Sequence, residues 1–244
     1  MKDNFSSQSS NYAKYRPTYP SDLYAYLNTI VTHRQNAWDC GTGNGQVATV
    51  LAKSFERVFA TDMSQAQIDN AIPANNVIYS VQPAEATNFN NKFFDLIVTA
   101  QAIHWFNFEK FYNEVRRTAK ENAVLCIIGY GRIEISPEID YIITNFYHNI
   151  IGDYWDKERQ YIDDNYQTLP FPFEEIETPK FINQQKWNLE HLIGYLNTWS
   201  GVKHFIKHKG YNPVNDLKDE LGQLWKSETH RTVRFPILLR IGKL

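Results

Sequence analysis

The sequence predicts an α/β protein with a doubly wound, seven-stranded and mostly parallel sheet beneath a helical lid. Three observations support this class. A glycine-rich turn at 41–45 follows a short apolar run and precedes a helical pattern. Strand-like and helix-like segments alternate from 21 to 129, which is typical of α/β folds. Several strand-like segments are almost continuously apolar, as in strands buried on both faces of a parallel sheet.

The elements of the first half follow from hydrophobic spacing and turn residues. We expect strands at residues 36–40, 57–61, 76–81, 93–99 and 123–129. We expect helices at residues 21–33, 45–54, 64–72 and 108–120. Ser21 and Ser64 are expected to be N-caps, because a serine hydroxyl can accept a hydrogen bond from the first helical turn.

After Gly129 the strict alternation of strand and helix ends. We expect helices at residues 137–151, 156–166, 189–199 and 214–228, and strands at 181–187 and 231–241. The two late strands would complete the sheet, and the helices would cover the carboxyl ends of the strands, where ligands bind in such folds. We therefore divide the chain into a lead-in with one helix at 1–35, an α/β core at 36–130, and a lid with the last strands at 131–244.

The composition of the chain bears on whether it binds nucleic acid or a membrane and on its cellular compartment. The 244 residues include 25 Lys and Arg and 27 Asp and Glu, and this balance gives no electrostatic signature for nucleic acid. We find no signal peptide and no segment that could span a bilayer, so we expect a cytoplasmic protein without membrane contact. The oligomeric state, monomer or dimer, stays open.

The cysteines and the clustered histidines do not predict a metal site. Cys40 and Cys126 each lie in an apolar run, which favours buried thiols over a disulfide or a metal centre. His204 and His208 have the spacing of helical metal ligands, but no third ligand accompanies them. A solvated helix face is the favoured interpretation, and we expect no metal.

The turn from Asp39 to Gly45 reads D-x-G-x-G-x-G. In the nicotinamide and flavin fingerprint the third glycine comes one residue later, at the place that Gln46 occupies here. Asp62 follows the second strand about twenty residues further on, where a carboxylate can accept hydrogen bonds from both ribose hydroxyls. A helix-capping or solvated carboxylate is the alternative, and the glycine turn favours ribose binding.

This turn resembles motif I of the class I S-adenosylmethionine-dependent methyltransferases, a family with a Rossmann-like fold. Residues 61–67, 82–85 and 94–101 are similar to the family's ribose, adenine and fourth-strand motifs. Three further patterns resemble the trans-aconitate and cantharidin methyltransferase group of small-molecule enzymes: Y-x-x-Y-R-P-x-Y-P at 12–20, A-x-H-W-F at 102–106 and T-W-S at 198–200. The resemblance is closest over residues 12–130.

The resemblance implies S-adenosylmethionine as the cofactor and a small molecule as the methyl acceptor, through a carboxylate or another oxygen. The implied cofactor-binding residues are Tyr15, Arg16, Asp39, Gly41, Thr42, Gly43, Gly45, Asp62, Met63, Ala84, Glu85 and Gln101. Among them the glycines would approach the methionine part, and Gln101 would lie near the sulfonium. Pro83 and Ala84 stand where many relatives have an Asp that reads the adenine amino group, so adenine recognition would depend on backbone atoms.

The acceptor would meet aromatic residues and one histidine. The implied substrate residues are Tyr12, Tyr19, Trp105 and Trp199, and His104 is the candidate catalytic residue. Histidine can act as a general base near neutral pH, although a packing histidine is the alternative. Arg16 could clamp a carboxylate of the cofactor or of an acidic substrate, or pair with a surface acid.

Three alternatives remain open at this point. One is an N- or C-methyltransferase that uses His104 as its base, because an amine or hydroxyl acceptor benefits more from a base than an ionised carboxylate does. Another is a non-catalytic protein that binds S-adenosylmethionine. A nicotinamide oxidoreductase is disfavoured by the glycine spacing.

Overall fold

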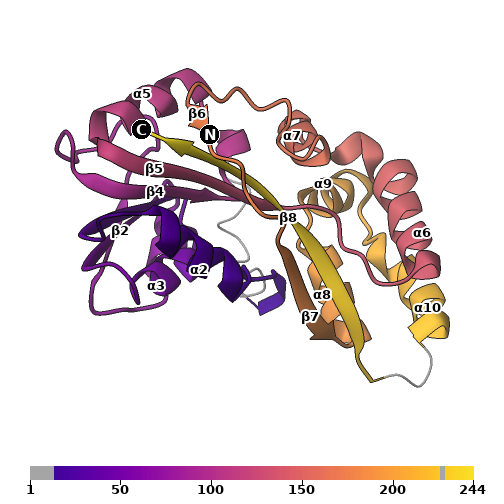
Figure 1. The fold of residues 1–244 in the computed structure, drawn as a ribbon. Helices are drawn as coiled ribbons and strands as arrows, with labels where there is room; N and C mark the ends of the chain where they lie inside the picture. The colour runs from indigo at the N-terminus through magenta and orange to yellow at the C-terminus, as the bar shows by residue number, and fades with distance from the viewer. Residues whose placement is uncertain (1–13, 226–228) are drawn as a thin grey trace.

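An eight-stranded sheet forms the centre of the protein (Figure 1), and the computed structural model describes residues 14–225 and 229–244. The strands are β1 (Asn36–Cys40), β2 (Arg57–Asp62), β3 (Val77–Val81), β4 (Phe94–Ala100), β5 (Ala119–Tyr130), β6 (Glu174–Glu175), β7 (Ile182–Trp187) and β8 (Arg231–Lys243). They run in the order β3-β2-β1-β4-β5-β8-β6, with β7 paired to β8 off this path. Strands β1 to β5 pair in parallel, and β8 pairs antiparallel with β5, β6 and β7.

Helices cover both faces of the sheet, which confirms the predicted doubly wound α/β class (Figure 1). The α-helices are α2 (Ser21–Ile30), α3 (Gln46–Leu51), α4 (Gln65–Asp69), α5 (Phe108–Thr118), α6 (Pro137–Asn145), α7 (Gln160–Asp163), α8 (Leu189–Asn197), α9 (Ser200–Lys209) and α10 (Val214–Trp225). Single turns of other helical types are η2 (Ile103–Trp105), η3 (Phe146–Ile150), η4 (Gly152–Tyr154) and η5 (Lys157–Arg159). Helices α2 and α3 lie on one face and α5 lies on the other (Figure 1).

Alternate residues of the buried strands fill two separate apolar layers, as the two-residue period of a strand requires. In β4, Ile97 packs with Trp38 and Phe111 on the α5 face. Its neighbours Leu96 and Val98 pack on the face that α2 and α3 cover. The free cysteines Cys40 and Cys126 are buried in different layers, so they cannot pair with each other.

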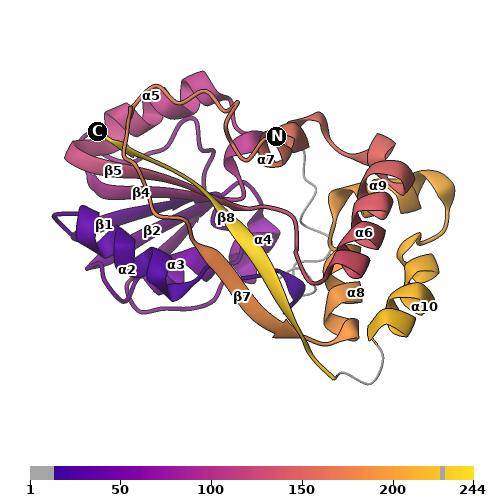
Figure 2. The ribbon, with the colours of Figure 1, turned by 45° about the vertical axis from the view of Figure 1, so that its right-hand side comes forward.

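The helices after β5 form a lid around a third, aromatic-rich cluster. Strand β8 joins this lid to the sheet, because residues 237–243 pair with β5 while residues 231–236 pair with β7. In Figure 2 the same strand runs diagonally from the sheet to the side of α8 and α10. The lid is therefore attached to the core through continuous strand pairing.

The structure corrects several predicted details. The sheet has eight strands instead of seven, because β8 is long enough to pair with two successive partners and the two-residue β6 adds an edge. Ser21 is the first residue inside α2 instead of its cap, and Pro20 takes the cap position. The helix predicted at 156–166 is shorter, because Asn165 and Tyr166 adopt left-handed φ angles of 53° and 59°. Ser64 does cap α4, accepting from the Gln67 N–H at 3.4 Å.

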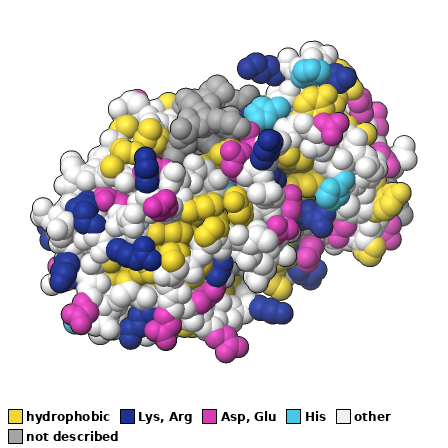
Figure 3. All heavy atoms as spheres, turned by 90° about the horizontal axis from the view of Figure 1, so that it is seen from above, with side chains coloured by type: hydrophobic (Ala, Val, Ile, Leu, Met, Phe, Trp, Pro, Cys, Tyr) yellow, Lys and Arg dark blue, Asp and Glu magenta, His cyan; other side chains and the backbone are white. Residues whose placement is uncertain are grey.

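The surface carries charges of both signs. On the face shown in Figure 3, basic and acidic side chains are interspersed. Within residues 14–225 and 229–244, no helix combines the length and the apolarity needed to cross a bilayer.

Candidate active site

A cavity lies over the carboxyl ends of β1, β2, β4 and β5 and encloses about 970 Å³, part of it open to solvent. The predicted site residues that line it are Arg16, Tyr19, Asp39, Gly41, Thr42, Gly43, Asp62, Met63, Ala84, Gln101 and Trp105. The further lining residues, which were not among the predicted site residues, include Gln67, Gln82, Phe106 and Tyr130. We call this space the cofactor cavity, because it gathers most of the residues expected to bind a nucleoside.

The three glycines of the turn have different roles. Gly41, Gly43 and Gly45 all adopt left-handed φ angles, of 72°, 55° and 85°. A Cβ on Gly41 would lie 2.6 Å from the Ala102 side chain, and a Cβ on Gly45 would overlap the Tyr79 hydroxyl. A Cβ on Gly43 would meet only a side-chain oxygen 3.9 Å away. Gly43 therefore faces the cavity, whereas the other two allow close packing.

Asp39 presents a buried carboxylate oxygen to the cofactor cavity. Its Oδ2 accepts hydrogen bonds from the Thr42 hydroxyl at 2.6 Å and from the Ala48 N–H at 2.9 Å. Its Oδ1 is buried and accepts from no described residue. Burial raises the pKa of Asp39 to about 7, although the two hydrogen bonds favour the ionised form. Such an oxygen suits a cationic ligand group, and the ammonium of S-adenosylmethionine has that chemistry.

Asp62 holds the glycine turn against the end of β2. One carboxylate oxygen accepts from the Gly43 N–H at 2.9 Å, and the other accepts from the Ser64 N–H at 2.9 Å. Each carboxylate oxygen has two lone pairs, so accepting a backbone hydrogen bond does not exclude a hydrogen bond from a ribose hydroxyl. Capping and ribose binding, which are alternatives at the level of sequence, are therefore compatible.

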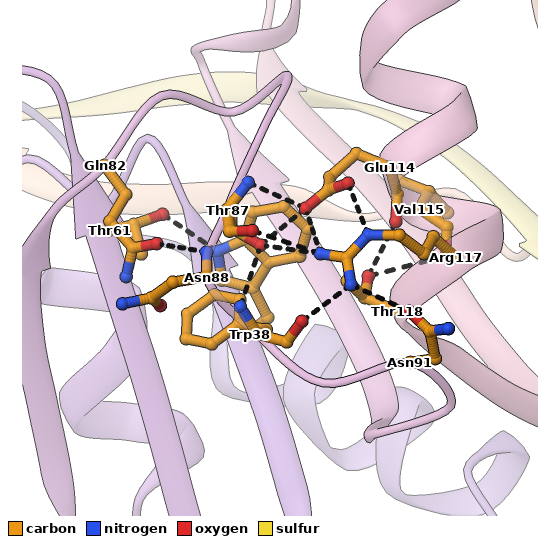
Figure 4. A network of polar contacts seen from close by, with 11 residues as sticks. Trp38, Thr61, Gln82, Thr87, Asn88, Asn91, Glu114, Val115, Arg117 and Thr118 are labelled. Atoms are coloured by element: carbon orange, nitrogen blue, oxygen red, sulfur yellow. Dashed lines mark hydrogen bonds and ion pairs between the residues drawn. The ribbon is translucent and has the colours of Figure 1, made fainter.

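Helix α5 fixes the loop between β3 and β4, whose residues Gln82 and Ala84 line the cofactor cavity (Figure 4). Glu114 accepts from the Thr87 N–H at 2.8 Å and from the Thr87 hydroxyl. Arg117 pairs with Glu114 at 2.6 Å and donates to the backbone of the same loop. This network positions the predicted adenine loop without lining the cavity.

A second cavity of about 520 Å³, part of it open to solvent, adjoins the cofactor cavity and reaches into the lid. Arg16, Gln101 and Trp105 line both spaces and form their junction. The residues that line only the second cavity include His104, Trp155, Asp156, Arg159, Thr198, Ser200 and Lys203. We call it the acceptor cavity. Of its lid residues, Thr198 and Ser200 belong to the T-W-S pattern, whereas the sequence assigned neither Arg159 nor Lys203 to a site.

Arg16 bridges the core and the lid at this junction. Its guanidinium donates to the Tyr130 hydroxyl at 2.7 Å and to the Thr198 carbonyl at 3.1 Å. Gln101 lies opposite, at the end of β4, with a left-handed φ of 53°. Its side-chain amide donates to the Tyr130 carbonyl at 3.2 Å, which holds Gln101 at the junction.

His104 is buried beside the acceptor cavity with 6% of its surface exposed. Burial, together with the nearby charges of Arg159 and Arg16, lowers the pKa of His104 to about 3. The imidazole is therefore neutral near physiological pH. A neutral imidazole with so low a pKa is a weak general base.

Several predicted site residues lie away from both cavities. Tyr15 packs on α8, with its ring 5.3 Å from His191. Glu85 accepts from the Asn107 N–H at the start of α5. Trp199 is buried in the lid cluster, 5.6 Å from the ring of Trp155, although its neighbours Thr198 and Ser200 line the acceptor cavity. Tyr12 lies outside the described residues.

Comparisons with known proteins agree with this geometry. A family model of a methyltransferase domain matches residues 38–127. A protein of Dictyostelium discoideum named as a methyltransferase is 34% identical over 249 residues, covering 99% of this chain and 95% of that protein. A protein of Saccharomyces cerevisiae named as an S-adenosylmethionine-dependent methyltransferase is 24% identical over 174 residues, covering 66% of this chain and 58% of the relative.

The similarity extends to a solved structure. A structure described as a type II methyltransferase, from Anaeromyxobacter dehalogenans, matches with a TM-score of 0.87 at 37% identity. The match covers 93% of this chain and 97% of that one. The lid is therefore included in the similarity together with the core.

The glycine turn gives a first prediction. Gly43→Ala should weaken the binding of S-adenosylhomocysteine at least about tenfold, because the new methyl group projects into the cofactor cavity. The left-handed φ should cost roughly 1–2 kcal/mol of stability, so the variant stays folded. Gly45→Ala is the matched control: its Cβ meets Tyr79, and thermal unfolding should show the larger loss of stability. Unchanged calorimetric affinity in folded Gly43→Ala would contradict this placement of the cofactor.

Asp39 gives a second prediction, with opposite effects on stability and binding. A folded-state pKa raised to about 7 means that the stability contributed by Asp39 is lost as the pH rises from about 4 to 7. Asp39→Asn keeps an oxygen for Thr42 and Ala48 and should raise the free energy of unfolding at pH 8 by roughly 1–4 kcal/mol. The same variant should bind S-adenosylhomocysteine about ten- to a hundredfold more weakly. Denaturant unfolding measures the expected gain in stability, and calorimetry measures the expected loss of affinity. A destabilised variant would contradict the expected gain in stability.

Proposed function

The chain belongs to the class I S-adenosylmethionine-dependent methyltransferases, and we propose that it methylates an oxygen of a small-molecule acceptor, with a carboxylate as the favoured group. The observation that carries this proposal is the charge of the acceptor cavity. Arg16, Arg159 and Lys203 line it together with one described carboxylate, Asp156. Such a lining attracts a carboxylate and disfavours a cationic amine.

The residues of the cofactor cavity suit each part of S-adenosylmethionine. Asp39 and the face of Gly43 would hold the methionine part, and Asp62 would accept from the ribose hydroxyls. Met63, which is 46% exposed, and Phe106 offer apolar surface to the adenine ring beside Ala84. The bound cofactor supplies an activated methyl group on a sulfonium.

The residues at the junction would orient the acceptor. Arg16 and Gln101 are fixed by hydrogen bonds to Tyr130, and Trp105 lines both cavities beside them. An ionised carboxylate already has the lone pair that attacks the methyl carbon, so orientation and the exclusion of water supply most of the acceleration. The ester that forms has lost its negative charge, which weakens its attraction to the lining cations and favours its release.

The low pKa of His104 separates an ionised carboxylate from acceptors that need a base. A hydroxyl, N- or C-acceptor must give up a proton, and a general base works best with a pKa near the working pH. His104 is far from that condition. A neutral histidine can still donate or accept a hydrogen bond, which is the role that we assign to it. A non-catalytic binding protein would have no need of a charged second cavity beside the cofactor.

Product analysis and a pH profile test this function together. We expect transfer of labelled methyl from S-adenosylmethionine to metabolite carboxylic acids, with an ester product that alkali hydrolyses. At saturating cofactor and acceptor, kcat should stay constant from pH 6 to 9, because His104 titrates well below this range. His104→Gln should lower kcat less than about tenfold, because His104 is not the base. Loss of a true general base would lower kcat by roughly 10²–10⁴. An alkali-stable product, or a limb near pH 6.5 that His104→Gln removes, would instead favour a hydroxyl, N- or C-acceptor.

A further inference from the structure

We propose that the acceptor cavity contains a distal anion subsite, in which Arg159 with Lys203 binds a negatively charged group of the acceptor remote from the methylated oxygen. This inference rests on the proposed function, because it assigns the end of the acceptor that points away from the cofactor. It makes Arg159 a specificity-determining residue for the choice of acceptor.

The position of Arg159 supports a distal role. Methyl transfer must occur where the two cavities meet, at Arg16, Gln101 and Trp105. Arg159 and Lys203 line only the acceptor cavity, on the side of the lid. A group bound there is separated from the cofactor by the junction residues. An acceptor that reaches both places must carry its second polar group away from the reacting oxygen.

Arg159 is held in a fixed orientation by its neighbours. Its Nε donates to the Tyr147 hydroxyl at 2.8 Å, and this hydroxyl donates to the Asp163 carboxylate at 2.7 Å. The Asp163 carboxylate lies 3.6 Å from the same Nε, and the guanidinium lies 5.0 Å from the ring centroid of Trp155. These contacts restrain the side chain before any ligand binds, which reduces the entropy cost of binding.

The two terminal amino groups of Arg159 take no part in these hydrogen bonds, which use its Nε. Among residues 14–225 and 229–244 they donate to no group, and the side chain is only 18% exposed. A restrained guanidinium whose two terminal amino groups are available matches the planar, bidentate geometry of a carboxylate.

The electrostatics of the cavity favour the same ligand. The charges of Arg159 and Arg16 add to burial in lowering the pKa of His104, and Arg16 adds to burial in lowering that of Lys203. His104 and Lys203, which both line the cavity, therefore experience a positive potential. The carboxylate of Asp156 lines the same space but lies 3.8 Å from the His204 ring. An anion on the acceptor would be stabilised by this potential.

The experiment measures a preference between paired ligands. Protein saturated with S-adenosylhomocysteine is titrated calorimetrically with linear dicarboxylates from malonate to adipate, and with the monocarboxylate of equal carbon number in each case. Wild-type protein should bind at least one dicarboxylate about ten- to a hundredfold more tightly than its partner. Arg159→Gln should reduce this ratio to near one while the affinity for S-adenosylhomocysteine stays unchanged.

Two further variants separate ligand binding from packing. Arg132→Gln is the matched control, because Arg132 lies 5.9 Å from the same Tyr147 ring but does not line the cavity, and it should keep the wild-type ratio. Tyr147→Phe keeps the ring and removes the hydroxyl that restrains Arg159, so its ratio should fall between those of wild type and Arg159→Gln. A structural role alone would move stability and leave the ratio unchanged.

The outcomes distinguish this subsite from the proposed function. A wild-type protein without dicarboxylate preference, or a preference that persists in Arg159→Gln, overturns the subsite. Methyl-ester formation from any carboxylic acid, measured on the same samples, reports on the proposed function by itself. Loss of ester formation with an intact dicarboxylate preference would contradict the reaction but leave the subsite standing.

Discussion

The parallel pairing of β1 between β2 and β4 is the constraint on which the site depends. Asp39 lies in register with Ala60 of β2 and with Val98 of β4, so all three strands end at the same edge of the sheet. Three groups consequently lie close together: the turn after β1, the Asp62 carboxylate at the end of β2 and Gln101 after β4. No long side chain is needed to bring them together. Asp62 then ties two of these strand ends together through the Gly43 N–H. A shift of one residue in either pairing would turn the terminal side chains to the opposite faces.

Strand β8 and Arg16 extend this arrangement into the lid. Because β8 pairs with β5 and then with β7, the lid cannot move as a unit without bending a strand that the core also uses. Arg16 adds a bridge on the ligand side, from Tyr130 at the end of β5 to Thr198 at the end of α8. The acceptor cavity lies beneath this bridge, so its shape depends on contacts from both parts. The lead-in that carries Arg16 is therefore a part of the site as well as a tether.

The core could be predicted from sequence because each of its features is local. Buried strands such as β1 and β4 are continuous apolar runs, and the turn at 41–45 has a spacing that only a few cofactors use. The different duties of Gly41, Gly43 and Gly45 could not be predicted, since they depend on Ala102 and Tyr79 from distant elements. The low pKa of His104 could not be predicted either, because it results from burial in the tertiary structure. The placement of Trp199 in the lid core could not be predicted, because it depends on packing against aromatic neighbours. Arg159 had no signal at all, because its environment is assembled by the η3 and α7 segments.

The two cavities present opposite charges to their ligands, and this difference orients the reaction. On the cofactor side a buried Asp39 oxygen accepts from no described residue, whereas the acceptor cavity is lined by Arg16, Arg159 and Lys203. Burying such groups before a ligand arrives costs stability, as the raised pKa of Asp39 and the lowered pKa of His104 indicate. A cationic cofactor offsets the buried negative charge of the cofactor cavity, and an anionic acceptor offsets the positive charge of the acceptor cavity. Each ligand is disfavoured in the opposite cavity. The unfavourable electrostatic energy of the buried groups is offset only when each ligand occupies its own side of the junction. The charges of the two cavities therefore select where each ligand binds.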